Sequence, residues 1–184
     1  FHLTMAVSPL FAAFAGVYFW FPRITGRMMN ERMAKIHFWF SIAGAYTVFL
    51  TMHVLGVGGM IRHSYDPTQY DFLKHLQPLN QFVSYAAFIL ASSQLIFLFN
   101  FFWSLFKGPE AASNPWKANT LEWAAPSPIP HGNWGSATPT VHRWPYDYGI
   151  PGAAEDFLPQ NLPAVSISGK GENFSGPDNR NSGL

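Results

Sequence analysis

Three long segments without Asp, Glu, Lys or Arg restrict what this 184-residue chain can fold into. They cover residues 1–21, 36–61 and 76–106. Because a helix rises about 1.5 Å per residue, each segment is long enough to cross a hydrocarbon core of roughly 30 Å. A water-soluble domain built from them would have almost no polar surface. The sequence therefore predicts an all-α integral membrane protein with three transmembrane helices, at about 1–22, 34–59 and 78–106.

The rest of the chain has a different composition. Residues 107–184 contain 11 of the 15 prolines, which disfavours long helices. Extended, polyproline-like structure is expected over 126–130. The same part contains Trp116, Trp123, Trp134 and Trp144, which is unusual for a free linker. We therefore divide the chain into a transmembrane region, 1–106, and an irregular tail, 107–184, that lies as an ordered strap against a protein surface.

Composition and missing motifs exclude several classes of function. The chain has no cysteine, 11% charged residues and a net charge of +1. These values argue against a disulfide framework, a thiolate metal site and a nucleic-acid binder that relies on bulk charge. No phosphate-binding loop or nucleophile elbow is present, so hydrolase and nucleotide-enzyme functions have no support.

The charges between the apolar segments predict the orientation of the helices. Residues 22–35 carry four basic residues and one acidic residue, whereas two basic residues are balanced by two acidic ones in 62–75. An excess of Lys and Arg in short loops marks the cytoplasmic or matrix side. Residues 22–35 and the tail are therefore expected inside, and residues 62–75 outside.

Local signals mark the helix ends. Pro22 and Gly26 are expected to stop the first helix, and Asn30 is a candidate N-cap for the second. Pro78 suits the first turn of the third helix, where a missing N–H costs nothing.

Histidines are the titratable candidates inside the apolar segments, where polar groups are costly and often functional. His37, one residue into its segment, can be a haem ligand or can simply sit in the headgroup zone, which we favour. His53 shares a helix face with Tyr46, seven residues earlier, and we expect it to pack against neighbouring helices and form a hydrogen bond rather than bind metal. His2 is either a frayed end or a ligand.

A second candidate constellation follows the middle helix. Arg62 and His63 come directly after an uncharged segment, at the depth where the carboxylates of a cofactor would surface. An arginine can bind a carboxylate through two parallel hydrogen bonds. Ordinary snorkelling of a long side chain at a helix end explains the position equally well.

The motifs of residues 1–135 together resemble the C-terminal part of subunit I of haem-copper cytochrome c oxidases. The resemblance rests on five pieces in the right order: Phe1-His2, Ala34-Lys-Ile-His-Phe38, His53-Val-Leu-Gly-Val-Gly-Gly-Met60 with Arg62, Leu121-Glu-Trp123, and Pro126-Ser-Pro128 with Pro130-His131. It implies that the three helices are the last three of a twelve-helix subunit I bundle.

The resemblance also implies roles for individual residues. Phe1 and His2 match the last two members of a His-Phe-His run, so His2 would be an axial ligand of the low-spin haem, a-type by analogy, and Phe1 would connect the two haem sites. Arg62 matches the first of two arginines near the haem propionates. His63 replaces the second arginine; its charge would depend on the propionates, so the redox potential would vary more with pH.

The other ligands implied by the resemblance lie on helices that are absent from this sequence. We therefore expect a separate chain, the N-terminal portion of subunit I, to ligate the high-spin haem and copper. Further expected partners are other oxidase subunits, cytochrome c as the electron donor and the lipid bilayer, but not nucleic acid. The expected location is the bacterial inner membrane, or alternatively the mitochondrial inner membrane.

The function implied is that of a fragment of a terminal respiratory oxidase. The whole oxidase reduces oxygen to water and translocates protons, whereas the fragment is not catalytic alone. Two alternatives stay open: the same fragment in a quinol oxidase, and a non-catalytic membrane scaffold. Residues 136–184, which include Pro145-Tyr-Asp-Tyr148 and Glu155-Asp-Phe-Leu-Pro159, lie beyond the matched part. They are expected to be either a packing arm or a docking site for another subunit.

Overall fold

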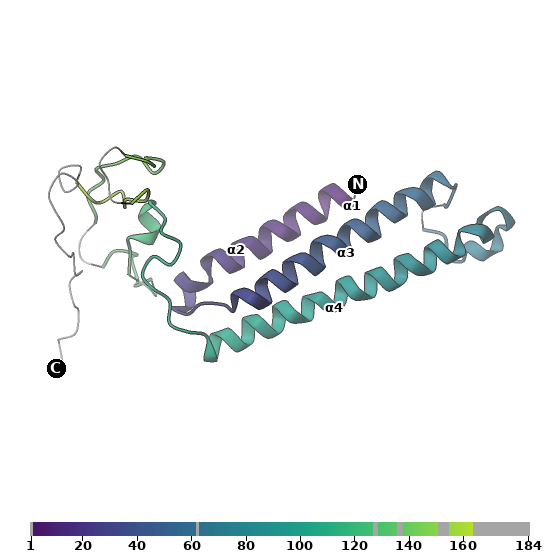
Figure 1. The fold of residues 1–184 in the computed structure, drawn as a ribbon, viewed down its shortest axis with the longest axis horizontal. Coiled ribbons are helices and arrows are strands. Elements are labelled where there is room, and N and C mark those ends of the chain that lie inside the picture. Colours follow the sequence, from purple (N-terminus) through teal and green to yellow (C-terminus); the bar gives the residue numbers. More distant parts are fainter. Residues whose placement is uncertain (1, 62, 127–128, 136–137, 151–154, 164–184) are drawn as a thin grey trace. The chain divides into compact units, whose positions relative to one another are not determined.

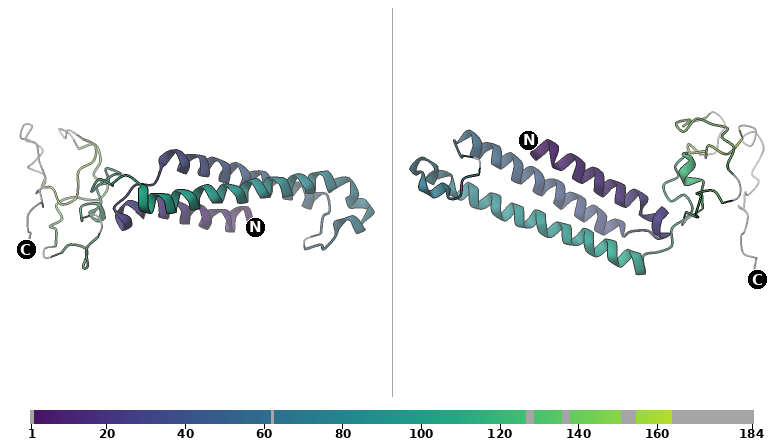
Figure 2. Two further views of the ribbon diagram at one scale, coloured as in Figure 1. Left: turned by 90° about the horizontal axis from the view of Figure 1, so that it is seen from below. Right: turned by 180° about the vertical axis from the view of Figure 1, so that it is seen from behind.

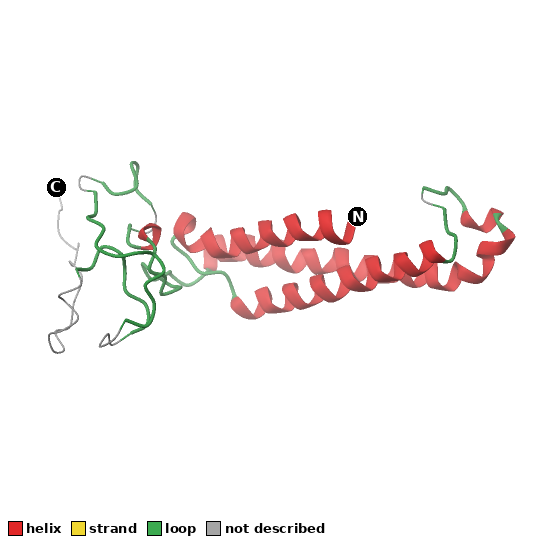
Figure 3. Cartoon of the chain, turned by 90° about the horizontal axis from the view of Figure 1, so that it is seen from above, coloured by secondary structure: helices red, strands yellow, loops and turns green. Residues whose placement is uncertain are grey.

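A computed structural model describes residues 2–61, 63–126, 129–135, 138–150 and 155–163. Its residues form two compact units, with a boundary between Ala111 and Ala112. The first contains the long helices and the second most of the tail. Among the described residues there is no strand, and one isolated antiparallel bridge joins Arg27 to Glu110. Figure 3 shows the helices in red and the loops of the described part in green.

The first unit consists of helices α1 (His2–Met5), α2 (Val7–Thr25), α3 (Glu31–Val57) and α4 (Gln77–Lys107). Two short 3-10 helices, η1 (Pro67–Gln69) and η2 (Asp71–Leu76), precede α4. Figure 1 shows α2, α3 and α4 running side by side. By length and composition, three helical stretches could cross a membrane: His2–Thr25, Glu31–Val57 and Asp71–Lys107. The prediction of an all-α membrane protein with three long apolar helices is confirmed.

The helix ends follow local chemistry. The Asn30 side chain accepts a hydrogen bond from the Met33 N–H at 3.1 Å, which confirms Asn30 as the N-cap of α3. The prediction that Pro22 helps to stop the first helix is wrong, because α2 continues to Thr25. A proline in the last turn removes one hydrogen bond, but the turn still closes through Gly26, whose φ of 70° is left-handed and whose N–H donates to Pro22 O. Pro78 lies in the first turn of α4, as predicted.

Two short segments pair where α2 leads into α3 and α4 ends. Met28 N donates to Pro109 O at 2.8 Å, and Ala111 N donates to Gly26 O at 2.9 Å. A Cβ atom at Gly108 would lie 2.6 Å from Met28 O, so only glycine permits this close approach. The pairing fixes the ends of all three long helices at one end of the unit.

Helix α2 packs on α3 and α4 through aromatic rings. Phe11 contacts Phe38 of α3, and Phe21 contacts Phe101 of α4, with ring centroids 6.1 and 5.5 Å apart. Phe14 contacts Phe97 of α4 at 4.8 Å. The two further views in Figure 2 show α2 alongside the α3–α4 pair. Aromatic side chains therefore fill the space between α2 and the other two helices.

The second unit has one regular element among its described residues, the 3-10 helix η3 (Leu121–Trp123). Gln160 organises much of the rest. Its side chain accepts from Leu121 N at 3.1 Å and donates to Arg143 O at 3.0 Å. Its backbone N–H donates to Asn119 O, and its carbonyl accepts from His142 N. This unit is thus held by hydrogen bonds between loops.

Candidate functional site

His2 opens α1 and its side chain is exposed. Its ring is stacked on Phe49 of α3, with centroids 6.2 Å apart and planes at 15°. Phe49 lies eight residues before the end of α3, which corresponds to about 12 Å along the helix axis. His2 therefore lies beside the C-terminal half of α3, about two turns before the end of that helix.

His63 lies in the loop between α3 and η1, and it too is exposed. Its φ of 62° is left-handed, which is uncommon for a residue with a side chain. Because α2 and α3 run in opposite directions, the chain begins beside the C-terminal half of α3, short of the end of that helix, as Figure 1 shows. The two other predicted site residues, Phe1 and Arg62, lie outside the described residues.

An acidic side chain lies three residues after His63. The Asp66 carboxylate accepts hydrogen bonds from the Thr68 hydroxyl at 2.6 Å and from the Thr68 N–H at 2.9 Å. These bonds, the hydroxyl first, stabilise the ionised carboxylate and hold the pKa of Asp66 below its ordinary value. The loop after α3 therefore keeps a negative charge at Asp66, four residues after Arg62 in the sequence.

His37 is buried, with 2% of its surface exposed, so the expectation of a headgroup-zone side chain is wrong. Its Nδ1 lies 3.2 Å from Tyr18 Oη of α2, and its Nε2 lies 3.1 Å from Gln94 Oε1 of α4. The Phe14 ring meets it edge-on at 4.7 Å. Both ring nitrogens have protein partners, so this histidine is a hydrogen-bonded part of the helix interface and not a ligand.

A second layer of hydrogen bonds continues from His37. Gln94 Nε2 donates to Ser41 Oγ at 3.0 Å and to Ser93 Oγ at 2.8 Å, and the two serine oxygens are 3.2 Å apart. We call Tyr18, His37, Ser41, Ser93 and Gln94 the interhelical polar cluster. Our sequence reasoning missed it. The signal was available: His37 and Ser41 are four residues apart, and four-residue spacing places side chains on one helix face.

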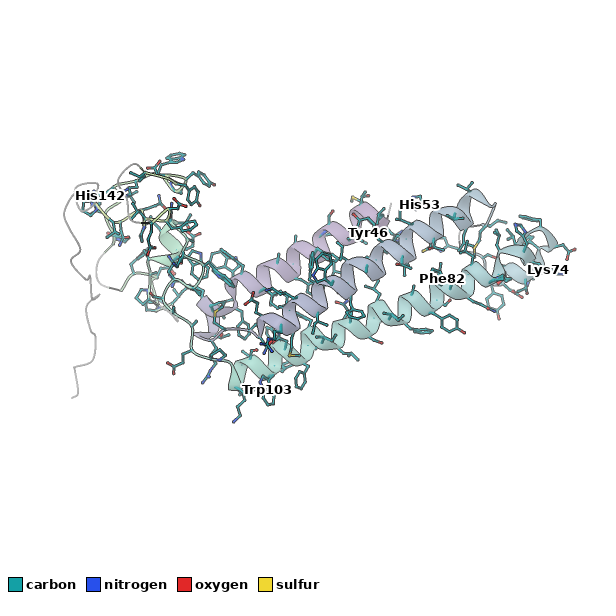
Figure 4. All side chains as sticks on the ribbon, viewed as in Figure 1. Tyr46, His53, Lys74, Phe82, Trp103 and His142 are labelled. Carbon is teal, nitrogen blue, oxygen red and sulfur yellow. The ribbon has the colours of Figure 1, made fainter. Side chains whose placement is uncertain are left out.

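His53 is exposed on this unit, so among the described helices of this chain it has no packing partner of the kind we expected. Its Nδ1 is 2.8 Å from Phe49 O, one turn earlier, which satisfies the expected hydrogen bond. Figure 4 labels His53 and Tyr46 on α3, and Tyr46 is likewise exposed. One nitrogen of His53 is thus used within its own helix.

These residues can supply a haem with one axial nitrogen. Among the described residues no group of three or more His, Cys, Asp or Glu side chains could hold a metal ion. An exposed imidazole stacked on Phe49 fits the donor chemistry of a haem axial ligand. A site with two axial ligands would need its second nitrogen from elsewhere.

Two comparisons with known sequences both find oxidase subunits that are similar to this chain. The family described as "Cytochrome C and Quinol oxidase polypeptide I" matches residues 1–89. This match covers α1, α2, α3 and the beginning of α4.

Individual relatives carry more specific names. The chain is 45% identical over 165 residues to "Alternative cytochrome c oxidase subunit 1" of Bradyrhizobium diazoefficiens, a match that covers 89% of this chain and 28% of the relative. It is 44% identical over 150 residues to cytochrome c oxidase subunit 1 of a Synechocystis species, with 82% and 26% covered. It is 41% identical over 138 residues to cytochrome c oxidase subunit 1 of Corynebacterium diphtheriae, a match that covers 74% of this chain and 24% of the relative.

The chain therefore spans about a quarter of the length of the curated relatives it matches. Its homology to cytochrome c oxidase subunit 1 supports a fragment of a haem-copper oxidase subunit, which is an oxidoreductase in its relatives. Together with the three apolar helices, it supports a multi-pass membrane protein.

Proposed function

We propose that this chain is the C-terminal portion of subunit I of a haem-copper cytochrome c oxidase, and that His2 is an axial ligand of its low-spin haem. The observation that carries the proposal is the exposed His2 imidazole, stacked on Phe49 in a sequence homologous to subunit 1. Haem bound there would supply one-electron transfer toward the oxygen-reducing site. The chain's own contribution is to hold and orient the imidazole.

The other ligands would come from helices outside these residues. The second low-spin ligand, the high-spin haem ligand and the copper ligands would lie on the rest of the subunit, either in the separate N-terminal chain we expect or in a longer form of this one. The assembled complex would accept electrons from cytochrome c, reduce oxygen to water and translocate protons. The names of the relatives favour cytochrome c over quinol as the donor.

The first prediction concerns His2. His2→Ala removes the only nitrogen that we assign to the haem iron, so the low-spin haem band in the reduced-minus-oxidised spectrum of the assembled complex is expected to disappear. His53→Ala is the matched control, because His53 is also exposed on this unit but bonds Phe49 O of its own helix. A normal low-spin band in the His2 variant would refute the proposal and favour a scaffold.

We further propose that Arg62 and His63 bind the haem propionates. In the sequence they follow α3, and His2 stacks on Phe49 in the C-terminal half of that helix, which supports this role. A neutral histidine donates one hydrogen bond and a protonated one donates two, so its contribution depends on pH. His63→Arg is expected to flatten the dependence of the low-spin haem's midpoint potential on pH, and an unchanged slope in a redox titration would count against the role.

A further inference from the structure

A shallow hollow lies on the surface of the second unit. It is lined by Tyr148, Gly149, Asp156 and Phe157 and has a volume of about 520 Å³. The Tyr148 and Phe157 rings meet edge to face, with centroids 5.6 Å apart and planes at 81°. They are 51% and 40% exposed, respectively. Gly149 adds no side chain, and a Cβ there would meet no atom within 4 Å, so the hollow is open on that side.

The chain around the hollow is acidic. Residues 144–163 contain Asp147, Glu155 and Asp156 and no Lys, Arg or His. The preceding cation, Arg143, is 8% exposed, and its guanidinium donates to Leu162 O at 2.9 Å and to Pro163 O at 3.3 Å. The Arg143 guanidinium is therefore bonded within its own unit. Two aromatic rings and an unneutralised negative charge face the solvent together.

The carboxylates in this segment differ in what they bind. Asp147 Oδ2 accepts a hydrogen bond from Trp144 N at 3.1 Å, so it serves the local turn. The exposed Asp156 carboxylate lines the hollow and forms no ion pair among the described residues. Only Asp156 combines an available charge with the aromatic pair.

This arrangement is complementary to one kind of group. A guanidinium or ammonium group is attracted to the face of an aromatic ring and to a carboxylate, and arginine can satisfy both at once. We propose that the hollow binds an arginine or lysine side chain of a partner protein chain in the membrane complex. A lipid surface is the poorer candidate, because anionic leaflets repel an acidic segment. The proposal rests on the membrane complex of the proposed function, but it does not depend on the assignment of His2.

The test is site-specific photo-cross-linking in the full chain, assembled in its membrane. Tyr148 is replaced by a photoreactive phenylalanine analogue, and the linked peptide is identified by mass spectrometry. We expect a peptide of a different protein chain with a lysine or arginine close to the linked position. Cross-links only to lipid or to this chain, a linked segment without a basic residue, or no cross-link would each overturn the proposal.

Two carboxylate variants in the photoreactive background sharpen the test. Asp156→Asn removes the charge that lines the hollow, whereas Glu155→Gln removes another exposed charge, from the neighbouring residue. Asp156→Asn is expected to lower the cross-link yield about two- to fivefold, as for an exposed cation–π or ion-pair contact, and Glu155→Gln to leave it unchanged. Phe157→Leu should lower the yield similarly. Equal yields for the two carboxylate variants would overturn the assignment.

Discussion

At the scale of single residues, side chains of the same type in similar sequence surroundings differ in how far they are buried. His2, His37 and His53 are all histidines in apolar segments, yet His37 is 2% exposed while the other two are exposed. A buried polar group must find partners within the protein, and His37 finds Tyr18 and Gln94. An exposed imidazole can instead meet a cofactor or another protein.

Asn100 shows the same rule at the end of the helices. It is completely buried in α4, and its amide accepts from Asn30 N and donates to Asn30 O, both at 3.0 Å. Ser104 Oγ lies 3.1 Å from the same amide oxygen. One side chain thus holds the N-cap residue of α3 against α4.

Asn100→Ala should therefore destabilise the helical unit. The change leaves the Asn30 N–H without its partner, and we expect a loss of about 1–3 kcal/mol, the usual range for a buried polar group left unsatisfied. The measurement is the free energy of unfolding of the membrane-assembled protein in mixed micelles. Asn80→Ala, in the same helix, is the control and should change it by less than about 0.5 kcal/mol. Equal losses for both variants would contradict this role of Asn100.

At the scale of elements, α3 and α4 form the tight pair of the unit. A Cβ atom at Gly44 would lie 3.0 Å from the Leu90 Cβ, so α4 approaches the backbone of α3 closely. Close approach at small residues with hydrogen bonds across the interface is how helices associate in lipid, where the hydrophobic effect does not drive them together. Ser41 and Ser93 supply those hydrogen bonds near the middle of the pair.

Cysteine cross-linking tests this pairing without background, since the chain has no cysteine. The Ser41 and Ser93 oxygens are 3.2 Å apart, so Ser41→Cys with Ser93→Cys should form a disulfide under mild oxidation in membranes. An introduced protease site between α3 and α4 makes the bond visible, because the two pieces stay together without reductant.

The control for this experiment moves one cysteine by a single position. Ser92 is exposed whereas Ser93 is buried, so Ser41→Cys with Ser92→Cys should give little cross-linking. Comparable disulfide yields for the two pairs would show that α3 and α4 do not meet along this face.

At the scale of the whole molecule, the chain combines a helical unit with a tail unit of a different kind. The helical unit buries polar clusters and exposes large apolar side chains, such as Trp39 at 66% and Phe88 at 69%. The tail unit buries Asn119, Arg143 and Gln160 beneath irregular backbone. Such a division suits a protein whose first part is solvated by lipid and by other helices and whose second part is solvated by water.

The orientation of the whole molecule can be tested on two matched lysines. Lys35 and Lys74 are both exposed, at 69% and 62% of their side chains, and each pairs with a carboxylate of its own segment. The excess of basic residues in 22–35 predicts that Lys35 lies inside and Lys74 outside. In sealed right-side-out vesicles, an impermeant amine reagent should label Lys74, and Lys35 only after permeabilisation. The reverse pattern would invert the proposed topology.

The sequence by itself determined the elements of this protein. The uncharged segments predict the three long helices, because a hydrocarbon layer tolerates few charges, and Asn30 and Pro78 predict helix starts through backbone groups close in sequence. The sequence did not determine the end of α2, since the effect of Pro22 depends on how Gly26 closes the last turn.

Only the tertiary structure decided which side chains meet. The spacing of His37 and Ser41 places both on one helix face, but in a uniformly apolar helix it does not show which face turns toward a neighbour. The partners of His37, Tyr18 and Gln94, therefore come from the packing of the helices. The same holds for the hollow between Tyr148 and Phe157, nine residues apart. The helix contacts are set by segments distant along the chain, and the hollow is set by the way an irregular loop turns back on itself, which local patterns do not specify.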